Sequence, residues 1–338
     1  MHVGVVGAGI VGLSAARFLT KRGHRVTLMD RFPLFHDKGS SHGASRIVRR
    51  AYPDPFYTAC MLEAYPLWGD LEQEAGLQLV REVGLLYFGS RDSERLQSME
   101  AGLTVCQVPH TTLGADQVAT VFPALILERD EVGVFTPEAG WVDAAAALRA
   151  TYALASNGKL EIKAPFEATQ EQLERDFDAY VVAPGGWIKD FVDLPVRVTL
   201  ETFGYAKLHV EGPVWIDDSD FAYGFPSDER GLKLGAHMTG YDIDPHKLGR
   251  EPEARAITFI TRKVERRFGA TVPVLHARGC IYTNAPNEDF LLGRLGAKGF
   301  YASACSGHGF KTGPWIGKLL SDFVEGSAKP EDHPRFCS

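Results

Sequence analysis

Cysteine is scarce in this sequence, and the few cysteines are poorly placed for cross-links. The chain has five, at positions 60, 106, 280, 305 and 337, an odd number with no C-x-x-C spacing. Scattered cysteines of this kind argue against both a disulfide framework and a zinc site. We therefore expect no metal and a reducing compartment, the cytoplasm.

Long apolar runs and an excess of basic residues are also missing. No apolar stretch approaches the ~20 residues of a membrane-spanning helix, and the apolar opening is interrupted by glycines and preceded by no basic residue, unlike a signal peptide. Lys and Arg number 36 against 43 Asp and Glu, a formal net charge of −7, which provides no broad positive field for nucleic acid or anionic lipid. Small molecules are the expected partners, with no nucleic acid and no membrane.

What is present is an ordinary globular composition. With 338 residues, of which 45% are apolar and 23% charged, the chain has the balance of an average soluble protein and the length of roughly two domains. A chain of this size needs no disulfide or metal to fold.

A glycine-rich turn stands between two predicted strands at the start of the chain. Apolar, β-rich runs at 3–6 and 25–29 flank Gly7-Ala8-Gly9-Ile10-Val11-Gly12 and a helical pattern over 13–22. In a dinucleotide-binding unit the first glycine permits a tight turn, the second lets the backbone approach a pyrophosphate, and the third lets helix and strand pack closely. Asp30 closes the second strand, where a carboxylate can hold ribose hydroxyls, and Arg31 follows it. The alternative is a tight turn without a ligand and a solvated Asp30, and the unit alone does not separate NAD from FAD.

The rest of the chain predicts a mixed protein with two kinds of sheet. Helices are expected at 56–75, 142–155, 251–268 and 314–324, a loop at 32–45, and strands at 82–89, 180–183, 196–210, 214–217, 221–225, 231–237, 279–283, 290–293 and 299–304. The successive strands between 196 and 237 favour an antiparallel sheet inserted into a nucleotide-binding domain. We predict an α/β fold, α+β overall: a Rossmann-like doubly wound domain (1–80, 136–195 and 275–338) with an inserted antiparallel-sheet substrate domain (81–135 and 196–274).

Several segments, in the same order and spread over nearly the whole chain, resemble one family. Besides the glycine turn ending at Asp30, they are Ser40-Ser41-His42-Gly43-Ala44-Ser45-Arg46-Ile47-Val48-Arg49, Tyr223-Gly224-Phe225-Pro226-Ser227, Gly231-Leu232-Lys233-Leu234-Gly235-Ala236-His237, Gly279-Cys280-Ile281-Tyr282-Thr283 and Ser306-Gly307-His308-Gly309-Phe310-Lys311. They are similar to the D-amino-acid oxidase superfamily of FAD-dependent oxidoreductases, and within it to the branch of monomeric sarcosine oxidase and N-methyltryptophan oxidase. The resemblance implies that the Rossmann-like domain binds FAD, and we expect a monomer.

The resemblance also implies roles for particular side chains. Cys280 would be bonded covalently to the flavin 8α carbon, Lys233 would activate dioxygen near flavin N5, and Arg49 with Lys311 would clamp the substrate carboxylate. Tyr223 and His237 would line the substrate pocket, and catalysis would involve Lys233, His237, Arg46 and Tyr223. The residues expected at the cofactor are Gly7, Gly9, Ile10, Val11, Gly12, Asp30, Arg31, Ser40, Ser41, His42, Ser45, Arg46, Cys280, Gly307, His308, Gly309 and Lys311.

Each of these residues also has a plainer interpretation. Guanidinium and ammonium groups bind a carboxylate through charge-assisted hydrogen bonds, but Arg49 and Lys311 can also be solvated surface cations. Lys233 can face outward on an alternating strand, and His237 can bind substrate without acting as a base. Cys305 competes with Cys280 for the position next to the flavin, and we expect it to be structural.

The function predicted from these features is an FAD-dependent amine oxidase. Its substrate would be a secondary-amine amino acid, either sarcosine, another N-methyl amino acid or a cyclic imino acid, oxidised at the C–N bond by hydride transfer to flavin N5, with O2 reduced to H2O2. One alternative is a flavin-dependent dehydrogenase that passes electrons to a protein or quinone. The other is a flavoenzyme acting on a macromolecule such as modified tRNA.

Overall fold

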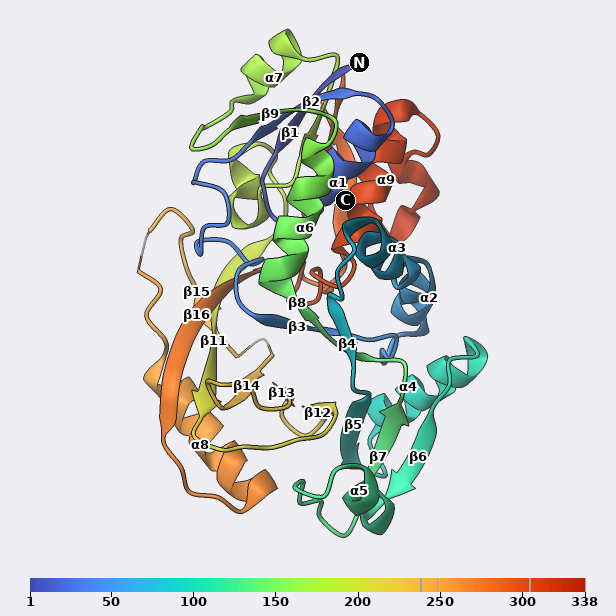
Figure 1. Ribbon diagram of the computed structural model, residues 1–338, viewed down its shortest axis with the longest axis vertical. Coiled ribbons are helices and arrows are strands. Elements are labelled where there is room, and N and C mark those ends of the chain that lie inside the picture. The colour runs from blue at the N-terminus through green and yellow to red at the C-terminus, as the bar shows by residue number, and fades with distance from the viewer. Residues whose placement is uncertain (238, 248, 304, 338) are drawn as a thin grey trace.

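The computed structural model describes residues 1–237, 239–247, 249–303 and 305–337, which form three sheets (Figure 1). The first sheet has the strand order β17-β18-β10-β1-β2-β9. Its neighbouring strands are parallel except for β17, which pairs antiparallel with β18. Their bounds are β1 His2–Val6, β2 Arg25–Met29, β9 Lys159–Lys163, β10 Ala179–Val182, β17 Leu291–Leu295 and β18 Gly299–Ser303.

Both faces of this sheet are covered, as expected of a doubly wound domain. On one face α1 (Ile10–Lys21) packs between α6 (Ala144–Ser156) and α9 (Gly313–Glu325). The other face carries α7 (Gln170–Asp176) and a 3₁₀ helix at Gly185–Asp190. Successive strand residues point to opposite faces, so Val5 joins the core under the helices while Val6 joins the core on the other side.

The second sheet lies at the other end of the molecule (Figure 1). Its order is β15-β11-β14-β13-β12-β5-β7-β6, with β16 paired along β11, and the only parallel pair among its described strands is β12 with β5. The helix α8 (Ala254–Phe268) packs against β11 and β14. The strand bounds are β5 Leu85–Ser90, β6 Thr111–Gly114, β7 Glu131–Thr136, β11 Arg197–Ala206, β12 Val214–Asp217, β13 Ala222–Gly224, β14 Leu232–Ala236, β15 Tyr241–Asp242 and β16 Val274–Asn284.

A small sheet joins the two ends of the molecule. Strand β8 (Gly140–Asp143) pairs antiparallel with β3 (Ser45–Val48) on one side and β4 (Val80–Glu82) on the other. The long β16 runs from the second sheet toward the first, as Figure 1 shows in orange. The segments that follow β3 and β16 therefore reach the space between the two larger sheets. The remaining elements are α2 Pro55–Ala64, α3 Pro66–Ala75, α4 Glu94–Val105, α5 Ala115–Val121 and two C-terminal 3₁₀ turns, Pro330–Asp332 and Pro334–Phe336.

The mixed fold class is confirmed, but several boundaries were wrong. The helix predicted at 56–75 is two helices, because Pro66 lacks the backbone N–H and starts a new helix at its first position. The strand predicted at 82–89 is divided by Gly84, whose φ of +79° bends the chain between β4 and β5. The last residue of the loop predicted at 32–45 already belongs to β3, and α8 starts at Ala254, three residues later than predicted. The final residue of the strand predicted at 299–304 lies outside the described residues.

None of the helices in the described ranges is long and apolar enough to cross a membrane.

Candidate functional site

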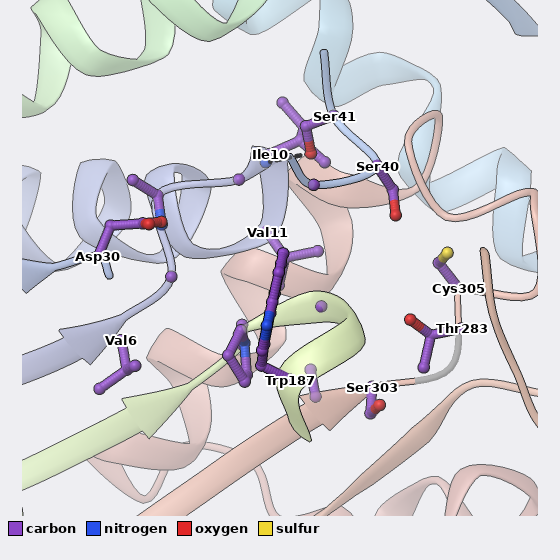
Figure 2. A pocket seen from close by; sticks show the side chains of 18 of the residues that line it. Val6, Ile10, Val11, Asp30, Ser40, Ser41, Trp187, Thr283, Ser303 and Cys305 are labelled. Atoms are coloured by element: carbon purple, nitrogen blue, oxygen red, sulfur yellow. Dashed lines mark hydrogen bonds between the residues drawn. The ribbon is translucent and has the colours of Figure 1, made fainter. Parts of the chain in front are cut away.

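A cavity of about 170 Å³ opens at the carboxyl ends of β1, β2 and β10, the edge at which ligands bind in open α/β sheets. Figure 2 shows the β1–α1 turn, the end of β2, the segment around Ser40 and the β16 and β18 ends converging on it. The predicted cofactor residues that line it are Gly7, Gly9, Ile10, Val11, Asp30, Arg31, Ser40, Ser41, His42 and Gly309.

Close backbone packing requires two of the three glycines in the β1–α1 turn, Gly7 and Gly12. Gly7 has a φ of +99°, and a Cβ there would lie 2.2 Å from the Ala183 carbonyl oxygen. A Cβ on Gly12 would lie 1.8 Å from the Gly7 carbonyl oxygen, so Gly12 supports the turn without lining the cavity. A Cβ on Gly9 would meet only the Ser41 side chain, with Oγ at 3.0 Å. The turn therefore brings the N-terminus of α1 to the cavity wall, an arrangement that favours an anion such as a phosphate.

Asp30 is held in a fixed orientation at the end of β2. Its carboxylate accepts hydrogen bonds from the backbone N–H groups of Ala8, at 2.7 Å, and Phe32, at 2.9 Å. The His36 Nε2 lies 3.4 Å away. Arg31, beside it, pairs with Asp190 at 2.8 Å. The Asp30 side chain is buried and lines the cavity.

Four polar side-chain atoms on the wall of this first cavity have no hydrogen-bond partner among the described residues. They are buried and belong to His42 (Nε2), Trp187 (Nε1), Thr283 (Oγ1) and Ser303 (Oγ), and Figure 2 shows the last three. Buried polar groups in native proteins are almost always paired. Their distribution along the cavity fits an extended ligand with several hydrogen-bonding groups.

A second cavity, of about 410 Å³, adjoins the first. The two share Ser40, Cys305, Gly309 and Phe310 as lining residues. The predicted residues that the structure brings together here are Ser45, Arg46, Arg49, Tyr223, Lys233, His237, Cys280, Gly307, His308 and Lys311. Six residues predicted at the cofactor line this cavity and not the first: Ser45, Arg46, Cys280, Gly307, His308 and Lys311.

Lys233 points into the second cavity and not outward. It is 4% exposed, and its Nζ donates to the Ser45 carbonyl oxygen at 2.8 Å and to Ser45 Oγ at 3.0 Å. The rings of Phe203 and Phe225 flank it, with centroids 4.8 and 4.5 Å from Nζ. Burial, and next the nearby Arg46, hold the pKa of Lys233 well below its ordinary value.

Arg49 and Lys311, hereafter the cation pair, lie over the same aromatic ring. The Arg49 guanidinium carbon is 4.4 Å and the Lys311 Nζ 5.5 Å from the ring centroid of Tyr52. Among the described residues, each donates only to a backbone carbonyl, Arg49 to Ala51 and Lys311 to His308. No carboxylate lies within 4.0 Å of either cation in the described part of the chain. Burial, and then Arg49, hold the pKa of Lys311 well below its ordinary value. A bound anion would oppose both effects, so the pair is arranged to receive one.

His308 fixes the ring beneath the cation pair. Its Nδ1 lies 3.2 Å from the Tyr52 hydroxyl and its Nε2 lies 3.1 Å from the Glu288 carbonyl oxygen. Burial, followed by Lys311, holds the pKa of His308 well below its ordinary value. The imidazole is therefore neutral: we assign the proton to Nε2, which donates to the carbonyl, and Nδ1 accepts from the tyrosine. Sequence reasoning missed Tyr52, because nothing in its local pattern distinguishes it from a core tyrosine.

Cys280 and Arg46 meet where the two cavities adjoin. The Cys280 Sγ is 4.0 Å from an Arg46 nitrogen and 3.9 Å from the Ser40 carbonyl oxygen. Burial raises the pKa of this thiol, and Arg46 opposes the effect. Arg46 also donates to the carbonyl groups of Ser40 and His42, and burial together with Arg46 lowers the pKa of His42 to about 4. Cys305 lines both cavities, so the structure places both candidate cysteines at the site.

Comparison with known proteins gives one consistent result. The model of the FAD dependent oxidoreductase family matches residues 2–323. The chain is 32% identical to the peroxisomal sarcosine oxidase of Homo sapiens, over 94% of this chain and 90% of that protein. It is 26% identical to the N-methyl-L-tryptophan oxidase of Yersinia pestis (strain Pestoides F), over 98% of this chain and 97% of that one. The open form of NikD, described as an unusual amino acid oxidase essential for nikkomycin biosynthesis, has the same fold, with a TM-score of 0.84 at 23% identity over 99% of this chain and 96% of NikD.

Proposed function

The chain belongs to the family of FAD-dependent oxidoreductases, and we propose that it is an oxidase that acts on the C–N bond of a secondary-amine amino acid. The observation that carries this proposal is the cation pair. Its two cations have no carboxylate partner in the part of the chain that the structure describes, and they line a cavity that adjoins the dinucleotide-type cavity. Sarcosine oxidase and N-methyl-L-tryptophan oxidase, both similar over nearly the whole chain, are named for substrates of this class.

The residues of the first cavity fit FAD. The glycine turn leaves room for a pyrophosphate at the start of α1, Asp30 lies where ribose hydroxyls would bind, and unpartnered polar atoms such as Thr283 Oγ1 offer further hydrogen bonds. We further propose that Cys280 carries the covalent bond to the flavin 8α carbon. The chemistry that FAD supplies when bound is acceptance of a hydride from the carbon next to the substrate nitrogen, followed by transfer of the two electrons to dioxygen, which leaves as hydrogen peroxide.

The chain itself positions the substrate and adjusts its protonation. The cation pair would hold the α-carboxylate by charge-assisted hydrogen bonds, while Tyr223 and His237 line the same cavity. Arg46 and Lys233 add positive charge to this partly desolvated space. Positive surroundings lower the pKa of a bound ammonium, so the cavity favours the neutral amine, whose nitrogen lone pair is needed to form the C=N bond.

Lys233 is proposed to favour the reaction with dioxygen. Its Nζ is held by Ser45 between the rings of Phe203 and Phe225, so a positive charge there would stabilise the anion formed when dioxygen takes its first electron. In Lys233→Met, reoxidation by air should slow far more than reduction by substrate. Equal slowing of both steps would remove this role.

The deciding experiment follows the visible spectrum of the purified protein without oxygen. Sarcosine, N-methyl-L-alanine, L-pipecolate, L-proline and glycine are added in turn, and air is then admitted. Bleaching by a secondary amine with rapid recovery and peroxide release supports the oxidase. Bleaching that persists in air indicates a dehydrogenase with another acceptor, and no bleaching by any of them refutes the proposed substrate class.

Two variant sets connect this activity to the residues. Arg49→Gln should raise KM by roughly 10- to 100-fold through loss of a charged hydrogen bond, whereas Arg50→Gln should not, because Arg50 pairs with Glu138 and does not line the cavity.

The attachment cysteine is tested by acid precipitation. Flavin should stay with acid-precipitated Cys305→Ser protein and be released from Cys280→Ser. The reverse result would assign the attachment to Cys305.

A further inference from the structure

The second cavity opens to solvent where its lining residues are exposed. Lys233 and Lys311 are nearly buried, but the side chains of Arg95 and Glu288 are 38% and 56% exposed, and Phe221 is 37% exposed. These three exposed lining residues come from α4, from the segment before β13 and from the segment after β16. They surround the opening of the second cavity, hereafter the mouth, and none of the three has a role in the proposed function.

On one side of the mouth, the positive charge of Arg95 is already matched. Its guanidinium lies 3.1 Å from the carboxylate of Asp218 and 4.0 Å from the ring centroid of Phe221. Asp218 is buried and also accepts hydrogen bonds from the hydroxyls of Tyr87 and Ser93. Arg95 with Phe221 therefore presents a flat, largely neutral surface to a ligand.

Arg335 also lines the second cavity, with 35% of its side chain exposed, and its positive charge is matched as well. It lies 2.6 Å from Asp54 and 2.9 Å from Asp289. Glu288 differs from these carboxylates because, in the described part of the chain, no Lys or Arg lies within 4.0 Å of it. Its nearest basic atom is His237 Nε2, at 4.0 Å.

Hydrogen bonds hold the Glu288 backbone in place at the mouth. Glu288 has a φ of +62°, its N–H donates to Ala285 at 3.1 Å, and its carbonyl accepts from His308. Phe221, across the mouth, has a φ of +55°, and its carbonyl accepts the His237 N–H at 3.0 Å. A non-glycine residue in this region costs on the order of 1–3 kcal/mol and persists where the surroundings hold it. Two such residues at one opening indicate that the positions of their side chains matter.

We propose that Glu288 determines substrate specificity, by binding a cationic or N–H group on the part of the substrate that lies away from its α-carboxylate. The preferred substrates would be secondary-amine amino acids with a basic side chain. The cation pair holds the carboxylate, Phe221 with Arg95 contacts the methylene groups, and Glu288 receives the terminal ammonium. This inference rests on the proposed function, because it assumes that an amino acid occupies the second cavity.

The test compares two substrates of nearly equal length. Nα-methyl-L-lysine ends in an ammonium and N-methyl-L-norleucine in a methyl group, and N-methyl-L-alanine reports the activity that does not depend on the distal group. For the wild-type holoenzyme we expect kcat/KM to favour the lysine derivative over the norleucine derivative by roughly tenfold, the size of one charged hydrogen bond. In Glu288→Gln this ratio should fall to about one, and in Glu288→Lys N-methyl-L-glutamate should become preferred over the lysine derivative.

Controls separate this inference from the proposed function. Glu229→Gln removes a carboxylate that is 82% exposed and does not line the cavity, so it should keep the wild-type ratio. Oxidation of N-methyl-L-alanine with a wild-type ratio near one would overturn the role of Glu288 and leave the proposed function standing. A preference that survives in Glu288→Gln would also overturn it. If none of the N-methyl substrates is oxidised, the inference fails, and the proposed function fails with it only if L-pipecolate and L-proline also leave the flavin unbleached.

Discussion

Replacing Arg267 with methionine is expected to destabilise the protein by about 3–5 kcal/mol, the usual loss when one partner of a buried ion pair is removed. Arg267 is 0% exposed on α8, and its guanidinium donates to Asp217 at 2.7 Å and to both oxygens of Glu131 at 2.6 and 2.7 Å. Methionine preserves most of the side-chain volume, so the loss of stability measures the cost of leaving two buried carboxylates without this cation. Asp217 keeps Lys263, at 2.8 Å, but Glu131 keeps only the backbone N–H of Glu128.

The assay is thermal unfolding of the holoenzyme followed by circular dichroism. A loss of this size corresponds to a fall in Tm of roughly 10 °C for a domain of this class. Arg266→Met, one residue earlier on the same helix, is the matched control. Arg266 and its partner Glu128 are 48% and 53% exposed, so its removal should cost less than about 1 kcal/mol. If the two variants unfold at the same temperature, the reasoning about burial is wrong.

The free energy of unfolding lost in Arg267→Met is expected to depend on pH. Burial raises the pKa of both Asp217 and Glu131, but hydrogen bonds from Arg267, joined by Lys263 at Asp217 and by the Glu128 backbone at Glu131, together outweigh burial, so both pKa values lie below the ordinary range. The stabilisation by carboxyls of lowered pKa is complete above the unfolded value, near pH 4, and is lost as pH falls through the folded values. Removing Arg267 leaves burial to raise both pKa values in the variant, so the free energy of unfolding that Arg267→Met loses should be largest at neutral pH and above, and should shrink as falling pH protonates the variant's carboxyls.

Three further predictions concern the candidate site. Tyr52→Phe keeps the ring beneath the cation pair but removes the hydroxyl that contacts His308. We expect KM to rise several-fold while the flavin spectrum stays unchanged. An unchanged KM would show that the ring alone positions the cations. Gly12→Ala should abolish flavin binding or folding because its Cβ would overlap the Gly7 carbonyl, whereas Gly69→Ala, in open space on α3, should be neutral or slightly stabilising by thermal unfolding. Propionate at 100 times its Kd should stabilise the protein by about 2.7 kcal/mol through binding to the cation pair, and equal stabilisation by propionamide would exclude a charge-based site.

The parts of the fold that were predictable are those encoded by local patterns. The β1–α1–β2 unit follows from period-2 and period-3.6 spacing around Gly7 and Gly12, and the structure matches it to within a few residues. The strand pairing was not predictable in the same way. β11 pairs with β16 about 80 residues further along the chain, and β5 pairs in parallel with β12, more than 120 residues away. Such register depends on the whole sheet and leaves no short-range signal.

In the candidate site, too, the residues that could be predicted are those that belong to local sequence motifs. Residues within recognisable segments, such as Lys233 and Lys311, could be named in advance, and the structure places both in one cavity. Tyr52, Arg95 and Glu288 could not, because each owes its place at the cavity to partners distant in sequence. The Arg95 partner is Asp218, 123 residues away, and the Tyr52 partner is His308, 256 residues away.

The two buried charge clusters of this protein differ in one respect that bears on function. Around Asp217 the cations Lys263 and Arg267 are matched by carboxylates, so that cluster is complete within the chain and fixes α8 to its sheet. In the second cavity Lys233 and Lys311 are also buried, but within the described ranges they donate only to carbonyl and hydroxyl oxygens. Burial without a counter-charge is costly and lowers the pKa of both ammonium groups, and packing alone gives no reason to retain two such lysines. The missing negative charge is what an amino-acid carboxylate would bring, so the imbalance is itself an argument that this cavity is built for an anionic substrate.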